Sequence, residues 1–157
     1  MKLYTVNNPD ELKLLKSKLR EFDFKSLTNR EIRDLIKKMR VLMKKENGVG
    51  LASNQVGLDF QVFIAQESGK FYAIFNPKIT KTFGKKVKME EGCLSVPGKY
   101  GFVDRYEKIV IEGLTPQGKK LKIKAWGLLA QIFQHETDHL NGELYINKAK
   151  EVFDFEQ

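Results

Sequence analysis

Cysteine and histidine are scarce in this 157-residue sequence: Cys93 is the single cysteine, and His135 and His139 are the two histidines. A lone cysteine excludes a disulfide within the chain, which leaves its thiol as a metal ligand, a nucleophile or a packing residue. No apolar run approaches the roughly 18 residues that a membrane span requires. The first residues also lack the apolar core of a signal peptide. We therefore expect a cytoplasmic protein without a membrane segment.

Positive charge, in contrast, is abundant, with 28 Lys and Arg against 20 Asp and Glu and a formal net charge of +8. Such an excess attracts polyanions. Many of the basic residues fall in two segments with helical spacing, residues 9–20 and 28–47, without a recognised nucleic-acid-binding motif. Two interpretations stay open: solvated helix faces, or a transient contact between these basic helices and an RNA-rich partner such as the ribosome. No specific binding to DNA is expected.

The N-terminal third of the chain carries helix signals. Pro9 can occupy the first turn of a short helix that continues through Leu12, Leu15 and Leu19. Thr28 and Glu31 have the spacing of a capping box, and apolar residues recur at helical intervals after them. We expect Asn47-Gly48 to end this second helix.

The middle of the chain changes to short runs of β-branched and aromatic residues, which predict strands at residues 60–65, 71–75, 108–114 and 121–125. Thr115-Pro116-Gln117-Gly118 predicts a turn between the last two runs. A final amphipathic helix is predicted over residues 128–140, and the tail after Gly142 has room for one strand. Helices at both ends with antiparallel strands between them indicate one α+β domain spanning residues 1–157.

The last predicted helix contains His135-Glu136-Thr137-Asp138-His139. Residues four apart on a helix are separated by about 400°, so the two imidazoles point the same way and can bind one ion. Glu136 then lies beside them, where it can reach a metal-bound water. Zinc peptidases with this motif usually take a third ligand downstream, but no histidine follows His139. A chance pair of histidines on one helix face is the plainer alternative.

Two upstream segments offer further candidate residues. Cys93 lies in a segment punctuated by Gly92, Pro97 and Gly98, and one cysteine with two histidines leaves a tetrahedral ion one open position for water. Taken alone, the cysteine could equally be a buried packing residue. The glycine-rich residues 48–57 form either a plain loop or a strip whose backbone a ligand can approach, with Gln55 as an amide donor.

Together these segments resemble peptide deformylases, which remove the N-formyl group from newly made bacterial proteins. The family carries the motifs G-x-G-L-A-A-x-Q, E-G-C-L-S and Q-H-E-x-D-H in this order. Here they read Gly48-Val49-Gly50-Leu51-Ala52-Ser53-Asn54-Gln55, then Glu91-Gly92-Cys93-Leu94-Ser95, then Gln134-His135-Glu136-Thr137-Asp138-His139. The resemblance spans roughly residues 9–146. It implies antiparallel β-sheets packed around a central metal-binding helix, with helices at the N-terminus.

The resemblance also implies a role for each matching position. One divalent metal ion, Fe(II) in the cell and often Zn, Ni or Co in preparations, would be bound by Cys93, His135 and His139. A metal-bound hydroxide would attack the formyl carbon of an N-formylmethionyl nascent peptide, with Glu136 as general base and acid. Gln55 and the backbone N–H of Leu94 would form the oxyanion hole. The backbone of Gly48, Val49 and Gly50 would pair with the substrate, and its methionine pocket would be lined by Val49, Met89, Leu128 and Ile132.

Asp138 has a different predicted role, because it lies on the side of the helix away from Glu136. We expect it to pair with Arg105 and so to anchor the helix that carries the two histidines.

Ser53 and Asn54 replace the Ala and the frequent Pro of the family motif, and we expect Asn54 to permit a looser backbone beside Gln55.

Some relatives carry a long C-terminal helix for ribosome docking, for which this chain has no room after Phe153. Any ribosome contact would then use the basic helices.

Two rival functions remain: a small H-E-x-x-H peptidase or other amide hydrolase, and a metal- or peptide-binding module without catalysis.

Overall fold

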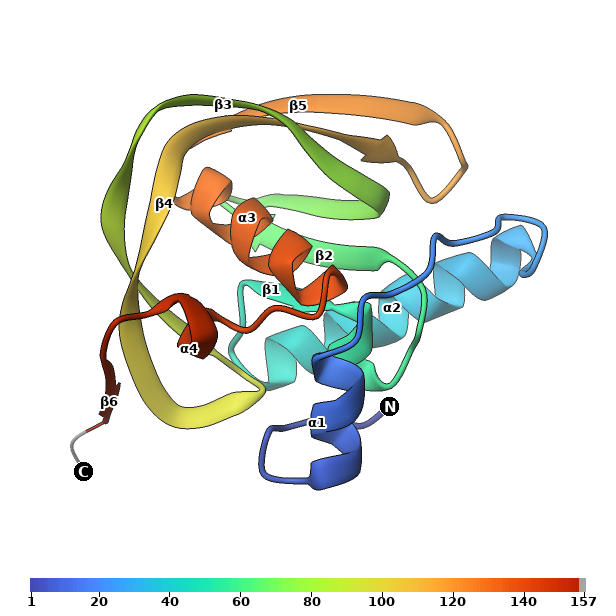
Figure 1. Cartoon of the computed structure of the whole chain (residues 1–157). Coiled ribbons are helices and arrows are strands. Elements are labelled where there is room, and N and C mark those ends of the chain that lie inside the picture. Colours follow the sequence, from blue (N-terminus) through green and yellow to red (C-terminus); the bar gives the residue numbers. More distant parts are fainter. Residues whose placement is uncertain (156–157) are drawn as a thin grey trace.

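The computed structural model describes residues 1–155 (Figure 1). Its helices are α1 (Pro9–Leu15), α2 (Asn29–Lys45), α3 (Leu128–Leu140) and α4 (Tyr145–Lys148), with one 3-10 turn, η1 (Ser53–Val56). Its strands are β1 (Gly50–Ala52), β2 (Val62–Glu67), β3 (Lys70–Cys93), β4 (Val96–Leu114), β5 (Lys120–Trp126) and β6 (Val152–Asp154). Of the helices in the described residues, none is long and apolar enough to cross a membrane.

The strands form an antiparallel sheet in the order β1-β2-β3-β4-β5, and β6 pairs with β4 at its outer edge. β3 and β4 are far longer than predicted, at 24 and 19 residues. Four register shifts interrupt their pairing, and such irregularities bend strands. The two strands consequently curve around α3 (Figure 1). The predicted class, α+β with antiparallel strands around the helix that carries both histidines, is confirmed.

Two apolar clusters fix α3 and the short strands β1 and β2. On one side, Phe133 of α3 packs its ring 5.6 Å from that of Phe63 and 5.3 Å from that of Tyr72. On the other side, α2 packs Met39 and Met43 against the residues of β1, β2 and β3. β1 and β2 therefore lie between two helices, and the glycine-rich segment that leads into β1 is held beside α3.

α2 begins at its predicted cap, whereas α1 ends earlier than predicted. Thr28 caps α2: the Glu31 carboxylate accepts from the Thr28 N–H at 3.0 Å, and the Thr28 hydroxyl accepts from the Glu31 N–H at 3.1 Å. α1 is shorter than predicted, because it ends at Leu15; Leu19 lies beyond it and donates its N–H to the carbonyl of Leu140. The tail contains the predicted strand, β6, preceded by the one-turn helix α4.

Candidate active site

The three candidate metal ligands converge on one point. α3 presents His135 and His139 one turn apart, with ring centroids separated by 4.9 Å. Cys93 ends β3, and its Sγ lies 3.3 Å from His139 Nε2. The ligand atoms of the three residues all lie within 4.8 Å of one another. One thiolate and two imidazoles at these separations suit a single transition-metal or zinc ion and leave a further position open.

A buried charge network orients His135. Glu91 Oε1 lies 2.8 Å from His135 Nδ1, which leaves Nε2 of the same ring for a metal. The Arg105 guanidinium donates to both carboxylate oxygens of Glu91, at 2.7 and 2.8 Å. Burial by itself would raise the pKa of Glu91, but the hydrogen bonds from Arg105 and His135 outweigh it and lower this pKa to about 2. Glu91 is thus held as a carboxylate in contact with His135, one of the candidate metal ligands.

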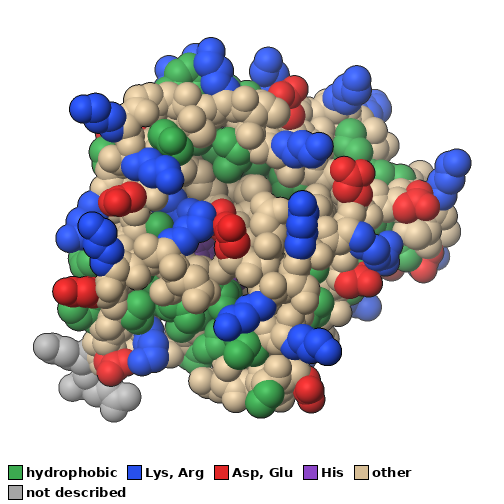
Figure 2. All heavy atoms as spheres, viewed as in Figure 1, with side chains coloured by type: hydrophobic (Ala, Val, Ile, Leu, Met, Phe, Trp, Pro, Cys, Tyr) green, Lys and Arg blue, Asp and Glu red, His purple; other side chains and the backbone are tan. Residues whose placement is uncertain are grey.

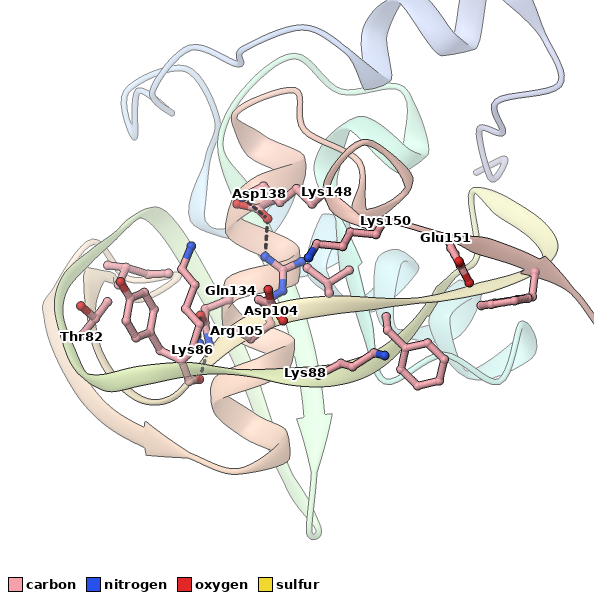
Figure 3. A pocket seen from close by; sticks show the side chains of 15 residues that line it. Thr82, Lys86, Lys88, Asp104, Arg105, Gln134, Asp138, Lys148, Lys150 and Glu151 are labelled. Atoms are coloured by element: carbon pink, nitrogen blue, oxygen red, sulfur yellow. Dashed lines mark hydrogen bonds and ion pairs between the residues drawn. The ribbon is translucent and has the colours of Figure 1, made fainter.

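The predicted pair between Arg105 and Asp138 is present. Arg105 Nη1 lies 2.5 Å from Asp138 Oδ2, and Lys148 Nζ lies 3.0 Å from the same oxygen (Figure 3). This contact joins β4, α3 and α4. A cavity of about 750 Å³ opens on this side of the network, and of the predicted site residues it is lined by Arg105 and Asp138 alone. It lies behind the ligand set and is not the candidate active site.

A second cavity, of about 510 Å³, contains the predicted chemistry. Most of the predicted catalytic, ligand and substrate-binding residues line it: Gln55, Cys93, Leu94, His135, Glu136, Val49, Gly50, Leu128 and Ile132. Gly48 and Met89, predicted to contact substrate, are not among its lining residues. Glu90 and Gln131 form part of the wall instead, and Gln131 Nε2 donates to the Glu90 carbonyl at 2.7 Å. His139 is buried behind this wall.

The carboxyl group of Glu136 is buried at the wall of this cavity. Its side chain lines the cavity, yet the residue is only 4% exposed, and among the described residues its Oε1 has no hydrogen-bond partner. Burial raises the pKa of Glu136 to about 7. A carboxyl group with such a pKa can both accept and release a proton near neutral pH.

The side-chain amide of Gln55 is held toward the ligand set. Gln55 Oε1 accepts from the Ala52 N–H at 2.9 Å, while Nε2 donates to Ser95 Oγ at 3.0 Å and lies 3.5 Å from Cys93 Sγ. Ser95 is a further residue of the site for which no role was predicted, although it lies in the E-G-C-L-S motif two residues after Cys93.

Asn54 differs from expectation, because it does not loosen the segment before Gln55. It is fully buried, and its Nδ2 donates to the carbonyl of His139 at 2.6 Å. The side chain therefore ties η1 to the C-terminal turn of α3. In place of the predicted loose backbone, η1 is held against α3 by this hydrogen bond.

Comparisons with known proteins agree with this geometry. The family profile of polypeptide deformylases matches residues 1–153. Peptide deformylase from Halothermothrix orenii is 45% identical over 120 residues, which cover 75% of this chain and 77% of the relative. A crystal structure of a peptide deformylase from Synechococcus elongatus in complex with actinonin has a TM-score of 0.87 at 31% identity, covering 96% of this chain and 79% of that one. The enzyme of the Vibrio parahaemolyticus bacteriophage VP16T, also in complex with actinonin, has a TM-score of 0.82 at 33% identity and covers 92% and 99%.

Proposed function

The chain belongs to the polypeptide deformylase family, and from this membership we propose that it hydrolyses the N-formyl group of newly made peptides that begin with N-formylmethionine. The observation that carries the proposal is the convergence of Cys93, His135 and His139 at a cavity that also holds Glu136 and Gln55. These five side chains supply a ligand set, a proton carrier and a polar donor, which are the parts that hydrolysis of an amide requires.

Cys93, His135 and His139 would hold one divalent ion, which we propose is Fe(II) in the cell, with Zn, Ni or Co as replacements in preparations. A bound ion of this kind lowers the pKa of water toward neutrality and polarises a carbonyl oxygen. Glu91 holds His135 in the tautomer that presents Nε2, through the 2.8 Å contact to Nδ1. The thiolate of Cys93 also makes the site sensitive to oxidation.

Glu136 would take a proton from the attacking water and deliver one to the departing amine. Its buried carboxyl group, with a pKa raised to about 7, suits both transfers. Gln55 Nε2 and the backbone N–H of Leu94 would donate to the formyl oxygen as negative charge develops on it. Losing one such donor typically costs about 2.7–4 kcal/mol of barrier.

The substrate backbone would add to the sheet beside β1. Within residues 1–155 this strand is the terminal one in the sheet order and pairs with β2 alone, so its other edge would be available to an extended peptide. Gly48, Val49 and Gly50 would provide the pairing groups. The substrate methionine would lie between the apolar residues Val49, Leu128 and Ile132, with Met89 as a further predicted contact.

We further propose that residues 1–157 act as one catalytic domain in the cytoplasm. Transient contact with the ribosome would use the basic faces of α1 and α2. Eleven Lys and Arg side chains offer such faces: Lys13 in α1, then Lys16, Lys18 and Arg20 just beyond it, and Arg30, Arg33, Lys37, Lys38, Arg40, Lys44 and Lys45 in α2.

The test is turnover of formyl-Met-Ala-Ser by anaerobically purified protein, with bound metal measured on the same sample. We expect release of formate in proportion to bound metal, and no cleavage of the unformylated peptide. Glu136→Ala should keep its metal and lose turnover. Cleavage between Met and Ala would indicate a peptidase, and an inert, fully metal-loaded protein would indicate a binding module; either result would overturn the proposal.

A further inference from the structure

Positive charge is concentrated on the arch formed by β3, β4 and β5. Residues 78–88 and 104–126 contain ten lysines and one arginine but only three acidic residues, which is a net charge of +8. The remaining positions hold 17 basic and 17 acidic residues. Residues 1–47, which include α1 and α2, have a weaker excess of 13 basic over seven acidic residues. The arch is therefore the more strongly basic of the two regions.

A row of three side chains crosses this arch from strand to strand. Phe83 of β3 is paired in register with Lys108 of β4, which is paired with Trp126 of β5. Residues opposite each other in a sheet project from the same face. The neighbours Ile109 and Ala125 project from the other face and are buried in the core. The row consequently faces solvent, and Trp126 is 67% exposed.

Three lysine ammonium groups lie close to the phenyl ring of Phe83 in this row. Lys81, Lys108 and Lys124 place Nζ at 4.8, 4.9 and 5.4 Å from the centroid of the Phe83 ring. The lysines crowd one another, and the hydrogen-bonding contact with Lys108 lowers the pKa of Lys124. Among the ion pairs within residues 1–155, none involves these three lysines.

The acidic side chain of Glu112 shares this face but is not ion-paired with the three lysines within residues 1–155. Glu112 is opposite Lys78 and Lys122 in register, two residues along β4 from Val110, which is opposite Lys81 and Lys124. Three converging cations that form no ion pair with a carboxylate repel one another. Anionic groups lying between them would remove this repulsion, so the arrangement favours a ligand with several negative charges.

We propose that this row (Phe83, Lys108 and Trp126, together with Lys81 and Lys124) binds single-stranded nucleic acid. The ammonium groups would contact successive phosphates, and an unstacked base would lie on the exposed indole of Trp126. Strips that combine lysines with exposed aromatic rings bind single strands in this manner, with little dependence on sequence. Bases in a duplex are already stacked and would not use the indole. An anionic membrane would use the lysines but would draw the indole into lipid.

The proposed site is separate from the catalytic cavity. None of the five residues lines that cavity, and the row lies on the face of the sheet opposite the core that holds α3. Blue side chains with green ones between them are visible along the upper edge of the molecule, over β3 and β5 (Figure 2). Binding of a strand there leaves the cavity open, and the inference stands or fails independently of the proposed deformylase activity.

Trp126 is the single tryptophan of the chain, so fluorescence excited selectively at tryptophan, and not at the five tyrosines, reports on the proposed site alone. We expect oligouridine of twelve nucleotides to quench this fluorescence saturably, and added salt to reverse the quenching. Heparin should bind without comparable quenching because it has no bases. Vesicles of phosphatidylglycerol should bind more weakly than oligouridine at the same salt concentration.

Matched variants locate the binding surface. K81Q/K108Q/K124Q should reduce the affinity for fluorescein-labelled oligouridine by about tenfold, and the slope of log K against log salt should fall by about 2, as three lost phosphate contacts predict. K37Q/K38Q/K45Q removes the same charge from exposed positions of α2 and should leave the slope nearly unchanged. Trp126→Ala should weaken binding by about tenfold without altering the slope, and Trp126→Phe should restore most of the affinity.

Three results would overturn the proposal: an equal loss of affinity in the α2 variant, an absence of quenching by bound oligouridine, or tighter binding to the vesicles than to the oligonucleotide. Each variant should keep the melting temperature and formyl-peptide turnover of the wild type, because all of the substituted side chains lie outside the catalytic cavity.

Discussion

The carboxylate of Glu136 fills the space in which a side chain at Gly50 would begin. A Cβ built on Gly50 would lie 2.5 Å from Glu136 Oε2 and 2.9 Å from its Cδ. β1 thus approaches α3 so closely that the carboxylate of Glu136 touches the backbone of the strand. The absence of a side chain at Gly50 therefore sets the position of this carboxylate.

Gly50→Ala should therefore displace Glu136 and lower kcat/KM for a formyl peptide by about 10²-fold, the effect typical of moving a reacting group by about 1 Å. Bound metal should be unchanged, because the three atoms nearest the added Cβ all belong to Glu136 and none to a candidate ligand. Gly48→Ala is the matched control. A Cβ there meets the flexible end of the Leu94 side chain at 2.7 Å, so we expect a smaller loss. Equal losses in the two variants would argue against positioning of Glu136 by Gly50.

Asn54→Ala should destabilise the protein by about 1–3 kcal/mol, since it removes a buried donor and leaves the His139 carbonyl without it. The measurement is urea denaturation of the apo and metal-loaded forms. Asn141→Ala is the control, because Asn141, at the exposed C-cap position just after α3, donates its Nδ2 to the Thr137 carbonyl at 3.2 Å. We expect that control to change the free energy of unfolding by less than about 0.5 kcal/mol. Similar changes in the free energy of unfolding for both variants would mean that the Asn54 contact stabilises the fold no more than the exposed Asn141 contact does.

Local spacing accounts for what the sequence predicted well. Thr28 and Glu31, three residues apart, specify the start of α2 through contacts within one turn. The four-residue interval between His135 and His139 places both rings on one face for the same reason. The angle between Asp138 and Glu136 on that helix likewise excluded Asp138 from the catalytic side, and it pairs with Arg105.

Contacts between distant segments account for what the sequence did not predict. Asn54 and His139 are 85 residues apart in the sequence, and Gln55 and Ser95 are 40 residues apart, so no local sequence pattern predicts either contact. The lengths of β3 and β4 depend on pairing across register shifts, which interrupt the alternation of apolar and polar residues. Met89 illustrates the consequence: it lies in β3 opposite Val103 and is not among the residues that line the catalytic cavity.

Glu91→Gln should weaken metal binding by about 10–100-fold, the usual effect of losing a partner that orients a ligating histidine. The neutral amide keeps the size of the side chain but removes the charge that faces His135 Nδ1 and Arg105. The measurement is competition with a chromogenic chelator. Glu90→Gln, at the exposed neighbouring position, should leave the affinity unchanged. Unaltered metal affinity in Glu91→Gln would show that the imidazole needs no carboxylate to hold its orientation.

Asp138→Asn tests whether the Arg105 contact anchors α3 or takes part in the reaction. Asp138 faces away from the catalytic cavity, and its carboxylate meets Arg105 at 2.5 Å and Lys148 at 3.0 Å. Loss of this charged hydrogen bond should reduce the free energy of unfolding by about 2 kcal/mol. The metal-loaded variant should retain nearly the full kcat, because Glu136, Gln55 and the ligand set keep their places.

Lys148→Gln separates the two partners of Asp138. It removes the ion pairs of Lys148 with Asp138 and with Glu143, at 3.0 and 3.2 Å, and leaves the Arg105–Asp138 pair in place. Because Lys148 is partly exposed, this change should reduce the free energy of unfolding by less than about 1 kcal/mol. Stability lost in Asp138→Asn and kept in Lys148→Gln would assign the effect to Arg105, and because Arg105 also makes two bonds to Glu91, the effect should extend to metal retention. A variant of Asp138 that loses turnover while its metal content and melting temperature stay at wild-type values would instead place this carboxylate in the proton-transfer path.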